Sequence, residues 1–152
     1  MFKRQLTATL LQAVASFPVA VLTGPRQSGK TTLLRHSFPS FTYISLESPD
    51  QRLFVEADPR GFLQCATQGL IIDEAQNYPD IFSYIQEYVD LNQNAVKIIL
   101  SGSQNFLLVE KISQTLAGRA ALLELLPLTY AEYMSSPNSK PPSLFEFLYH
   151  GA

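Results

Sequence analysis

The chain has 152 residues, of which 46% are hydrophobic and 16% are charged, a balance that suits one globular domain. The net charge of −2 argues against a strong nucleic-acid footprint, and no apolar run is long enough to span a membrane. A single cysteine, Cys65, cannot form an internal disulfide, so we expect a reducing, cytoplasmic location.

Residues 1–18 predict an amphipathic helix that packs on the rest of the domain. Phe2, Leu6, Leu10 and Val14 recur every four residues and form one apolar stripe. Basic residues before the apolar positions resemble a secretory signal, but polar residues interrupt the run, which excludes that interpretation. We expect the helix to end before Phe17-Pro18.

The next segment is a buried strand, Val19–Thr23, followed by a phosphate-binding pattern and a helix up to Ser37. Residues 24–31 match G-x-x-x-x-G-K-[ST], in which backbone N–H groups and the lysine contact phosphates and the final hydroxyl binds Mg²⁺. The helix that starts at the loop directs its positive end at the same anion. The predicted nucleotide-binding residues are Gly24, Pro25, Arg26, Gln27, Ser28, Gly29, Lys30, Thr31 and Thr32.

Two further strands are expected at 41–46 and 69–73, separated by short helices within 50–65. The second of them ends in Asp73 and Glu74. We predict that Asp73 holds Mg²⁺ opposite Thr31 and that Glu74 orients or deprotonates the attacking water. Asp73 comes 43 residues after Lys30, which leaves room for one additional strand between the two motifs.

A helix over 79–91 precedes a fourth strand at 96–100, and the polar residues 101–104 follow it. Ser103 and Gln104, with Ser101 as a further candidate, could sense the γ-phosphate. The alternative is a Ser-Gly turn in which Ser103 caps the next helix, expected over 105–117. Ser103 is the candidate that we assign to the nucleotide site.

Arg119 lies between Gly118 and a fifth strand at 120–125. We expect it near one edge of the nucleotide cleft, where an arginine would stabilise the γ-phosphate in its own chain or in a neighbouring subunit. The alternative is a surface arginine near a helix C-terminus. The catalytic candidates are therefore Lys30, Glu74 and Arg119.

The chain after Pro127 changes character. Thr129–Glu132 is a capping-box pattern for a short helix, 135–143 contains three prolines and is typical of a linker, and Ser143–Glu146 is a second capping box. We therefore expect a P-loop core at 19–128 and a segment at 129–152 that leads to an absent C-terminal domain.

Five motifs in order resemble those of the prokaryotic AAA-type predicted ATPases, in which this domain precedes a C-terminal domain of unknown function. The motifs are Leu22–Leu33, Ile44–Glu47, Leu70–Gln76, Leu100–Asn105 and Leu116–Leu128. The resemblance implies that Gly24, Gly29, Lys30, Thr31 and Thr32 bind nucleotide, that Asp73 and Glu74 serve Mg²⁺ and water, and that Arg119 is the family's Gly-Arg position.

Residues and resemblance together predict a three-layer α/β P-loop domain with a five-stranded, mainly parallel sheet in the order 5-1-4-3-2. Its expected activity is hydrolysis of Mg-ATP to ADP and phosphate, which drives a conformational change. The alternative is a nucleotide-dependent switch or interaction module with negligible hydrolysis; a small-molecule kinase is less favoured, because an arginine-rich lid is lacking. The expected partners are the C-terminal domain and a second copy or another protein.

Overall fold

A computed structural model describes residues 2–92, 96–103 and 106–135, and its centre is a five-stranded parallel sheet. The strands are β1 (Val19–Gly24), β2 (Thr42–Ser45), β3 (Leu70–Asp73), β4 (Ile98–Ser103) and β5 (Ala120–Glu124). They lie in the order β2-β3-β4-β1-β5, and every pairing is parallel. This order confirms the predicted 5-1-4-3-2, and the sheet is wholly rather than mainly parallel.

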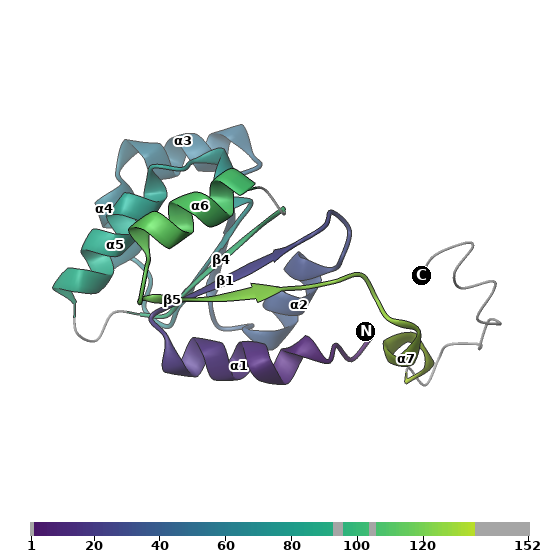
Figure 1. Cartoon of the computed structure of the whole chain (residues 1–152). Helices are drawn as coiled ribbons and strands as arrows, with labels where there is room; N and C mark the ends of the chain where they lie inside the picture. Colours follow the sequence, from purple (N-terminus) through teal and green to yellow (C-terminus); the bar gives the residue numbers. More distant parts are fainter. Residues whose placement is uncertain (1, 93–95, 104–105, 136–152) are drawn as a thin grey trace.

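Helices cover both faces of the sheet and complete a three-layer architecture. Figure 1 shows α1 and α2 on one face and α3 to α6 on the other. Their bounds are α1 (Leu6–Ser16), α2 (Lys30–Ser37), α3 (Pro49–Ala57), α4 (Pro59–Gln64), α5 (Ile81–Leu91) and α6 (Phe106–Thr115). A 3-10 helix, η1 (Ala75–Asn77), follows β3, and a short helix, α7 (Tyr130–Met134), follows β5.

Side chains of the central strands alternate between two hydrophobic clusters. Val19 and Val21 of β1 belong to the cluster on the α3–α6 side, whereas Ala20 and Leu22 pack with Leu10 of α1 on the opposite side. A strand that is buried on both faces reads as a continuous apolar run, which is why β1, β3 and β4 could be located in the sequence.

Several boundaries differ from the sequence-based expectation. The N-terminal helix covers Leu6–Ser16 rather than all of residues 1–18. The fourth strand does not end at Leu100, because its ladder with β1 continues until Ser103 lies opposite Gly24. The helix expected from Pro79 begins at Ile81, after η1 and a turn that includes Pro79. The Thr129 capping box is confirmed, since the Thr129 and Glu132 side chains each bond the other's backbone N–H.

No helix in the described ranges is long and apolar enough to cross a membrane. Gln104, part of the 135–143 linker and the segment from Ser143 onward fall outside the described residues.

Candidate nucleotide-binding site

The carboxyl ends of β1, β3 and β4 meet at one edge of the sheet, and the candidate site is built there. The loop of residues 24–29 leaves β1 at this edge and leads directly into α2. Because all strands are parallel, the polar residues that follow β3 and β4 reach the same edge.

The phosphate loop has a backbone that requires glycine. Gly24 and Gly29 have φ angles of +151° and +88°, and Gln27 is also left-handed with φ +63°. A Cβ added to Gly24 would lie 2.3 Å from the Leu125 carbonyl oxygen, so no other residue fits without displacing backbone. Close packing against Leu125, as well as the φ angle, therefore requires glycine at position 24.

Lys30 begins α2 and is buried beneath the loop, with 6% of its surface exposed. Its Nζ donates hydrogen bonds to the carbonyl oxygens of Gly24 at 3.0 Å and Pro25 at 2.8 Å. The ammonium group is thus held against the loop backbone, close to where a phosphate chain would lie along the loop.

Asp73 connects the phosphate loop to the neighbouring strands. One carboxylate oxygen accepts hydrogen bonds from Thr31 Oγ1 at 2.6 Å and from the Tyr43 hydroxyl at 2.9 Å. The other accepts from Ser101 Oγ at 2.5 Å and from the Glu74 backbone N–H at 3.1 Å. Burial and the bond to Asp73 raise the pKa of Tyr43 to about 12, so this phenol stays a donor at neutral pH.

Glu74 is held in an uncommon conformation beside Asp73. Its backbone is left-handed, with φ +53°, which is unusual for a residue other than glycine. The Gln76 side-chain amide donates to Glu74 Oε2 and also lies 3.3 Å from Ser103 Oγ. The structure thus brings Ser103 to the site through Gln76, as a contact of the residue that orients Glu74.

These residues surround a cavity of about 690 Å³ at the edge of the sheet. Its lining comprises Arg26, Gln27, Gly29, Lys30, Thr31, Thr32, Glu47, Arg52, Glu74, Gln76 and Asn77. Every cavity-lining residue of the 24–32 segment had been predicted from the motif. Four residues of this lining, and Tyr43 at Asp73, were not predicted as site residues: Glu47, Arg52, Gln76 and Asn77. Glu47 and Gln76 each end one of the five motifs, but no role followed from their position there, and the other three lie outside the motifs.

The donor set at Thr31 and Asp73 fits a hard divalent cation. A hydroxyl oxygen and a carboxylate oxygen 2.6 Å apart are the two protein ligands that this type of site offers, with phosphate and water oxygens as the others. In the described part of the chain no group of three or more His, Cys, Asp or Glu residues could hold a metal by itself. Two buried polar atoms of the same region, Ser28 Oγ and Gln76 Oε1, have no hydrogen-bond partner among the described residues.

Arg119 is not at this site, and the expectation that it lies near the nucleotide cleft is wrong. Its backbone carbonyl accepts a hydrogen bond from Val19 N, at the start of β1, whereas the phosphate loop leaves the other end of that strand. The guanidinium instead pairs with Asp90 of α5, with Nε–Oδ1 at 2.6 Å and Nη2–Oδ2 at 2.8 Å. A strand rises about 3.3 Å per residue, so the length of β1 separates Arg119 from its own loop by roughly 16 Å.

The loop, the buried lysine and the aspartate at the end of β3, with β4 between that strand and β1, define a P-loop domain of the AAA type. The chain belongs to a family described as an AAA domain, whose model matches residues 16–134. An uncharacterized protein of Mycobacterium tuberculosis is 39% identical over 137 residues, covering 88% of this chain and 31% of the relative. An uncharacterized protein of Methanocaldococcus jannaschii is 30% identical over 132 residues, covering 79% of this chain and 29% of the relative.

Solved structures share the fold at low sequence identity. The Walker-type ATPase of Pyrococcus abyssi superposes with a TM-score of 0.63 at 18% identity, covering 88% of this chain and 56% of the other. AMPPCP-bound DnaA from Aquifex aeolicus gives a TM-score of 0.59 at 14% identity, covering 95% of this chain and 54% of the other. The chain spans about a third of the curated relatives that it matches, 31% in the M. tuberculosis protein.

Proposed function

We propose that this chain binds ATP with Mg²⁺ and hydrolyses it to ADP and phosphate. The observation that carries the proposal is the Asp73 carboxylate, which holds the hydroxyl of Thr31 from the phosphate loop and that of Ser101 from β4. These contacts join the two halves of a nucleotide site, and Glu74 lies directly beside them. The AAA domain match supports nucleotide chemistry of this kind.

The roles of the residues follow from their positions. Loop N–H groups and Lys30 would bind the β- and γ-phosphates, and Thr31 with Asp73 would hold Mg²⁺, which neutralises charge that develops on the phosphates. Glu74 would accept a proton from the attacking water, and Gln76 would orient its carboxylate. As the water oxygen bonds to the γ-phosphorus, the bond from the γ-phosphorus to the β,γ-bridging oxygen would break, and that oxygen would leave with ADP, giving ADP and inorganic phosphate.

We infer a P-loop core at 19–128, with the N-terminal segment 1–18 that contains α1 packed on it, and a segment at 129–152 that connects to a further domain. A conformational change driven by hydrolysis, with that domain or another protein as its partner, completes the proposal.

Three variants separate binding from chemistry. Lys30→Ala removes charge-assisted hydrogen bonds of about 1.5–3 kcal/mol each, so Mg-ATP affinity should fall at least tenfold in a calorimetric titration. Asp73→Asn should remove the Mg²⁺ dependence of binding. Glu74→Gln should keep ATP affinity within a few-fold and lose hydrolysis, because an amide cannot take up the proton. Lys111→Ala, an exposed lysine of α6, is the matched control.

The outcomes distinguish the two functions. Unchanged affinity in Lys30→Ala would contradict the nucleotide site itself. Equal hydrolysis by the parent chain and Glu74→Gln would contradict the base role. Tight Mg-ATP binding with no turnover in the parent chain would instead favour the nucleotide-dependent switch.

A further inference from the structure

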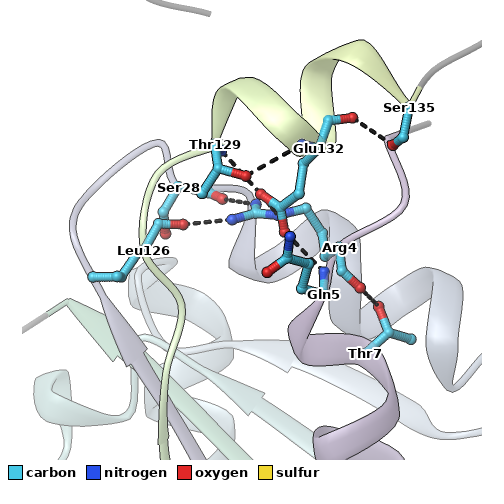
Figure 2. Close-up of polar contacts among 8 residues, drawn as sticks. All are labelled: Arg4, Gln5, Thr7, Ser28, Leu126, Thr129, Glu132 and Ser135. Atoms are coloured by element: carbon cyan, nitrogen blue, oxygen red, sulfur yellow. Dashed lines mark hydrogen bonds and ion pairs between the residues drawn. The ribbon is translucent and has the colours of Figure 1, made fainter.

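A buried arginine outside the cavity contacts the back of the phosphate loop. Arg4 precedes α1 and is only 8% exposed, yet it does not line the cavity. Figure 2 shows its guanidinium between the phosphate loop, the segment after β5 and α7. Nη1 donates to the Ser28 carbonyl oxygen at 2.6 Å, and Nη2 donates to the Leu126 carbonyl oxygen. The N-terminal segment, the phosphate loop and the segment that runs from Leu126 into α7 are far apart in the sequence, and they meet at the Arg4 side chain.

The contact with Ser28 fixes a peptide unit of the phosphate loop. The Ser28 carbonyl and the Gly29 N–H belong to the same planar trans peptide, so they point in opposite directions. Since the carbonyl is turned toward Arg4 behind the loop, the Gly29 N–H is turned away from Arg4. A loop N–H aimed forward in this way is what an anion nest requires.

Glu132 of α7 compensates the buried charge of Arg4. It is 5% exposed, and its Oε2 lies 3.3 Å from Arg4 Nε as an ion pair. The same carboxylate accepts from the backbone N–H groups of Gln5 at 2.8 Å and Thr129 at 3.0 Å. Burial alone would raise the pKa of Glu132, but these N–H donors and the Arg4 charge outweigh it and hold the pKa below its usual value.

A cation this deeply buried needs compensating neighbours. Two carbonyl oxygens accept from Nη1 and Nη2, whereas Nε has no hydrogen-bond partner among the described residues and is compensated by the charge of Glu132. If α7 moves away, Arg4 loses its carboxylate and the Ser28 peptide loses a fixed donor. We propose that Arg4 is a positioning residue for the phosphate loop, and that α7 controls nucleotide affinity by holding Arg4 through Glu132. This inference rests on the proposed ATP site and assigns it a link to α7.

The experiment compares Mg-ATP affinity with thermal stability in the 152-residue chain. Arg4→Met should weaken binding at least tenfold, and Arg4→Lys should recover only part of it, because one ammonium cannot reach three acceptors in fixed directions. Glu132→Gln should weaken binding to a lesser extent. The double variant Arg4→Met/Glu132→Gln should bind no worse than Arg4→Met, since Glu132 acts through Arg4.

Two controls separate positioning from loss of stability. Ile85→Val removes a methyl group from a fully buried residue of α5, and Arg60→Met removes an exposed arginine that pairs with Glu87. Ile85→Val should lower the melting temperature and leave Mg-ATP affinity unchanged. Arg60→Met should alter neither the affinity nor the loop. If Arg4→Met does not fold, the affinities of Arg4→Lys and Glu132→Gln decide the question.

Amide hydrogen exchange without nucleotide makes the two proposals separable. Exchange of the 24–31 amides should be faster in Arg4→Met than in the parent chain and unchanged in Ile85→Val. Affinity within twofold of the parent in Arg4→Met and Glu132→Gln would overturn the positioning role. If the parent chain itself fails to bind Mg-ATP, the proposed function is overturned, and unchanged loop exchange in Arg4→Met would then overturn the positioning role as well.

Discussion

Arg52 brings a second guanidinium to the nucleotide cavity, besides Arg26 of the loop. It belongs to α3, lines the same cavity as Lys30 and Glu74, and is half-buried. Within the described ranges Arg4, Arg60 and Arg119 each pair with an acid, whereas no ion pair engages Arg52. An arginine so placed can donate a forked pair of hydrogen bonds to phosphate oxygens.

We therefore expect Arg52→Ala to reduce ATP turnover, ATP affinity or both by about tenfold to a hundredfold, the equivalent of one charged hydrogen bond. Steady-state kinetics over a range of ATP concentrations measure both effects. Arg60→Ala, on the neighbouring helix α4, should leave them unchanged because its partner Glu87 is outside the cavity. Kinetics of Arg52→Ala equal to those of the parent chain would leave Arg52 without a role at the site.

Individual site residues were predictable only where they belong to a local motif. Thr31 and Asp73 each follow a recognisable pattern, and the structure places their side chains 2.6 Å apart. Arg4 contacts a carbonyl that is 122 residues away, and no local periodicity indicates such a contact. Gln76 lies inside a quoted motif, but its role depends on the left-handed backbone of Glu74, which sequence pattern does not specify.

At the scale of the elements, α7 is held to the domain by a carboxylate that must be ionised. The pKa of Glu132 is lower in the folded chain than its ordinary value of about 4.3. Such a group contributes stability that is complete above its unfolded pKa and is lost as the pH falls through its folded pKa. The docking of α7 should therefore weaken on acidification below about pH 4.

The stability advantage of the parent chain over Glu132→Gln should accordingly be largest near neutral pH and shrink as the pH falls below the ordinary pKa of a glutamate and through the lower folded pKa of Glu132. Urea denaturation at several pH values measures this difference. Glu87→Gln, which removes one carboxylate of an exposed pair, is the control for general charge effects. A constant difference between the parent and Glu132→Gln across this range would show that ionisation of Glu132 does not contribute.

The elements themselves were largely predictable because the physical signals are strong and local. β1, β3 and β4 are buried on both faces, and each reads as an apolar run followed by polar residues. The end of β4 was not predictable in the same way. Ser101 and Gly102 look like a turn in isolation, and only their pairing with β1 extends the strand to Ser103.

At the scale of the whole molecule, Arg119 lies on the surface at the end of the sheet opposite the candidate nucleotide site. A contact with ATP in its own chain is excluded by that position, so a role in catalysis requires a neighbouring subunit. The guanidinium would then have to exchange Asp90 for a phosphate. The sequence analysis correctly placed Arg119 before the fifth strand. It did not show that the start of this strand lies at the end of the sheet opposite the phosphate loop.

If Arg119 acts between subunits, specific activity should rise with protein concentration. Arg119→Ala should lower turnover more than ATP affinity, and mixing it with Lys30→Ala should restore part of the hydrolysis, because each variant retains what the other lacks. The variant Asp90→Ala distinguishes a catalytic role between subunits from a structural ion pair, because it breaks the ion pair but keeps the Arg119 guanidinium. Concentration-independent activity, no complementation and equal effects of Arg119→Ala and Asp90→Ala would leave only a structural ion pair.

The strand order also determines when the molecule can form during synthesis. β1 emerges early, but its neighbours are β4, from Ile98, and β5, from Ala120. A growing polypeptide that has reached only α5 therefore carries an apolar strand with both of its edges unpaired, which favours association with other chains. The pairing of β1 with β4 and β5 joins residues up to about a hundred positions apart, and such long-range pairing slows folding. The nascent chain should thus depend on protection from association until β5 has left the ribosome.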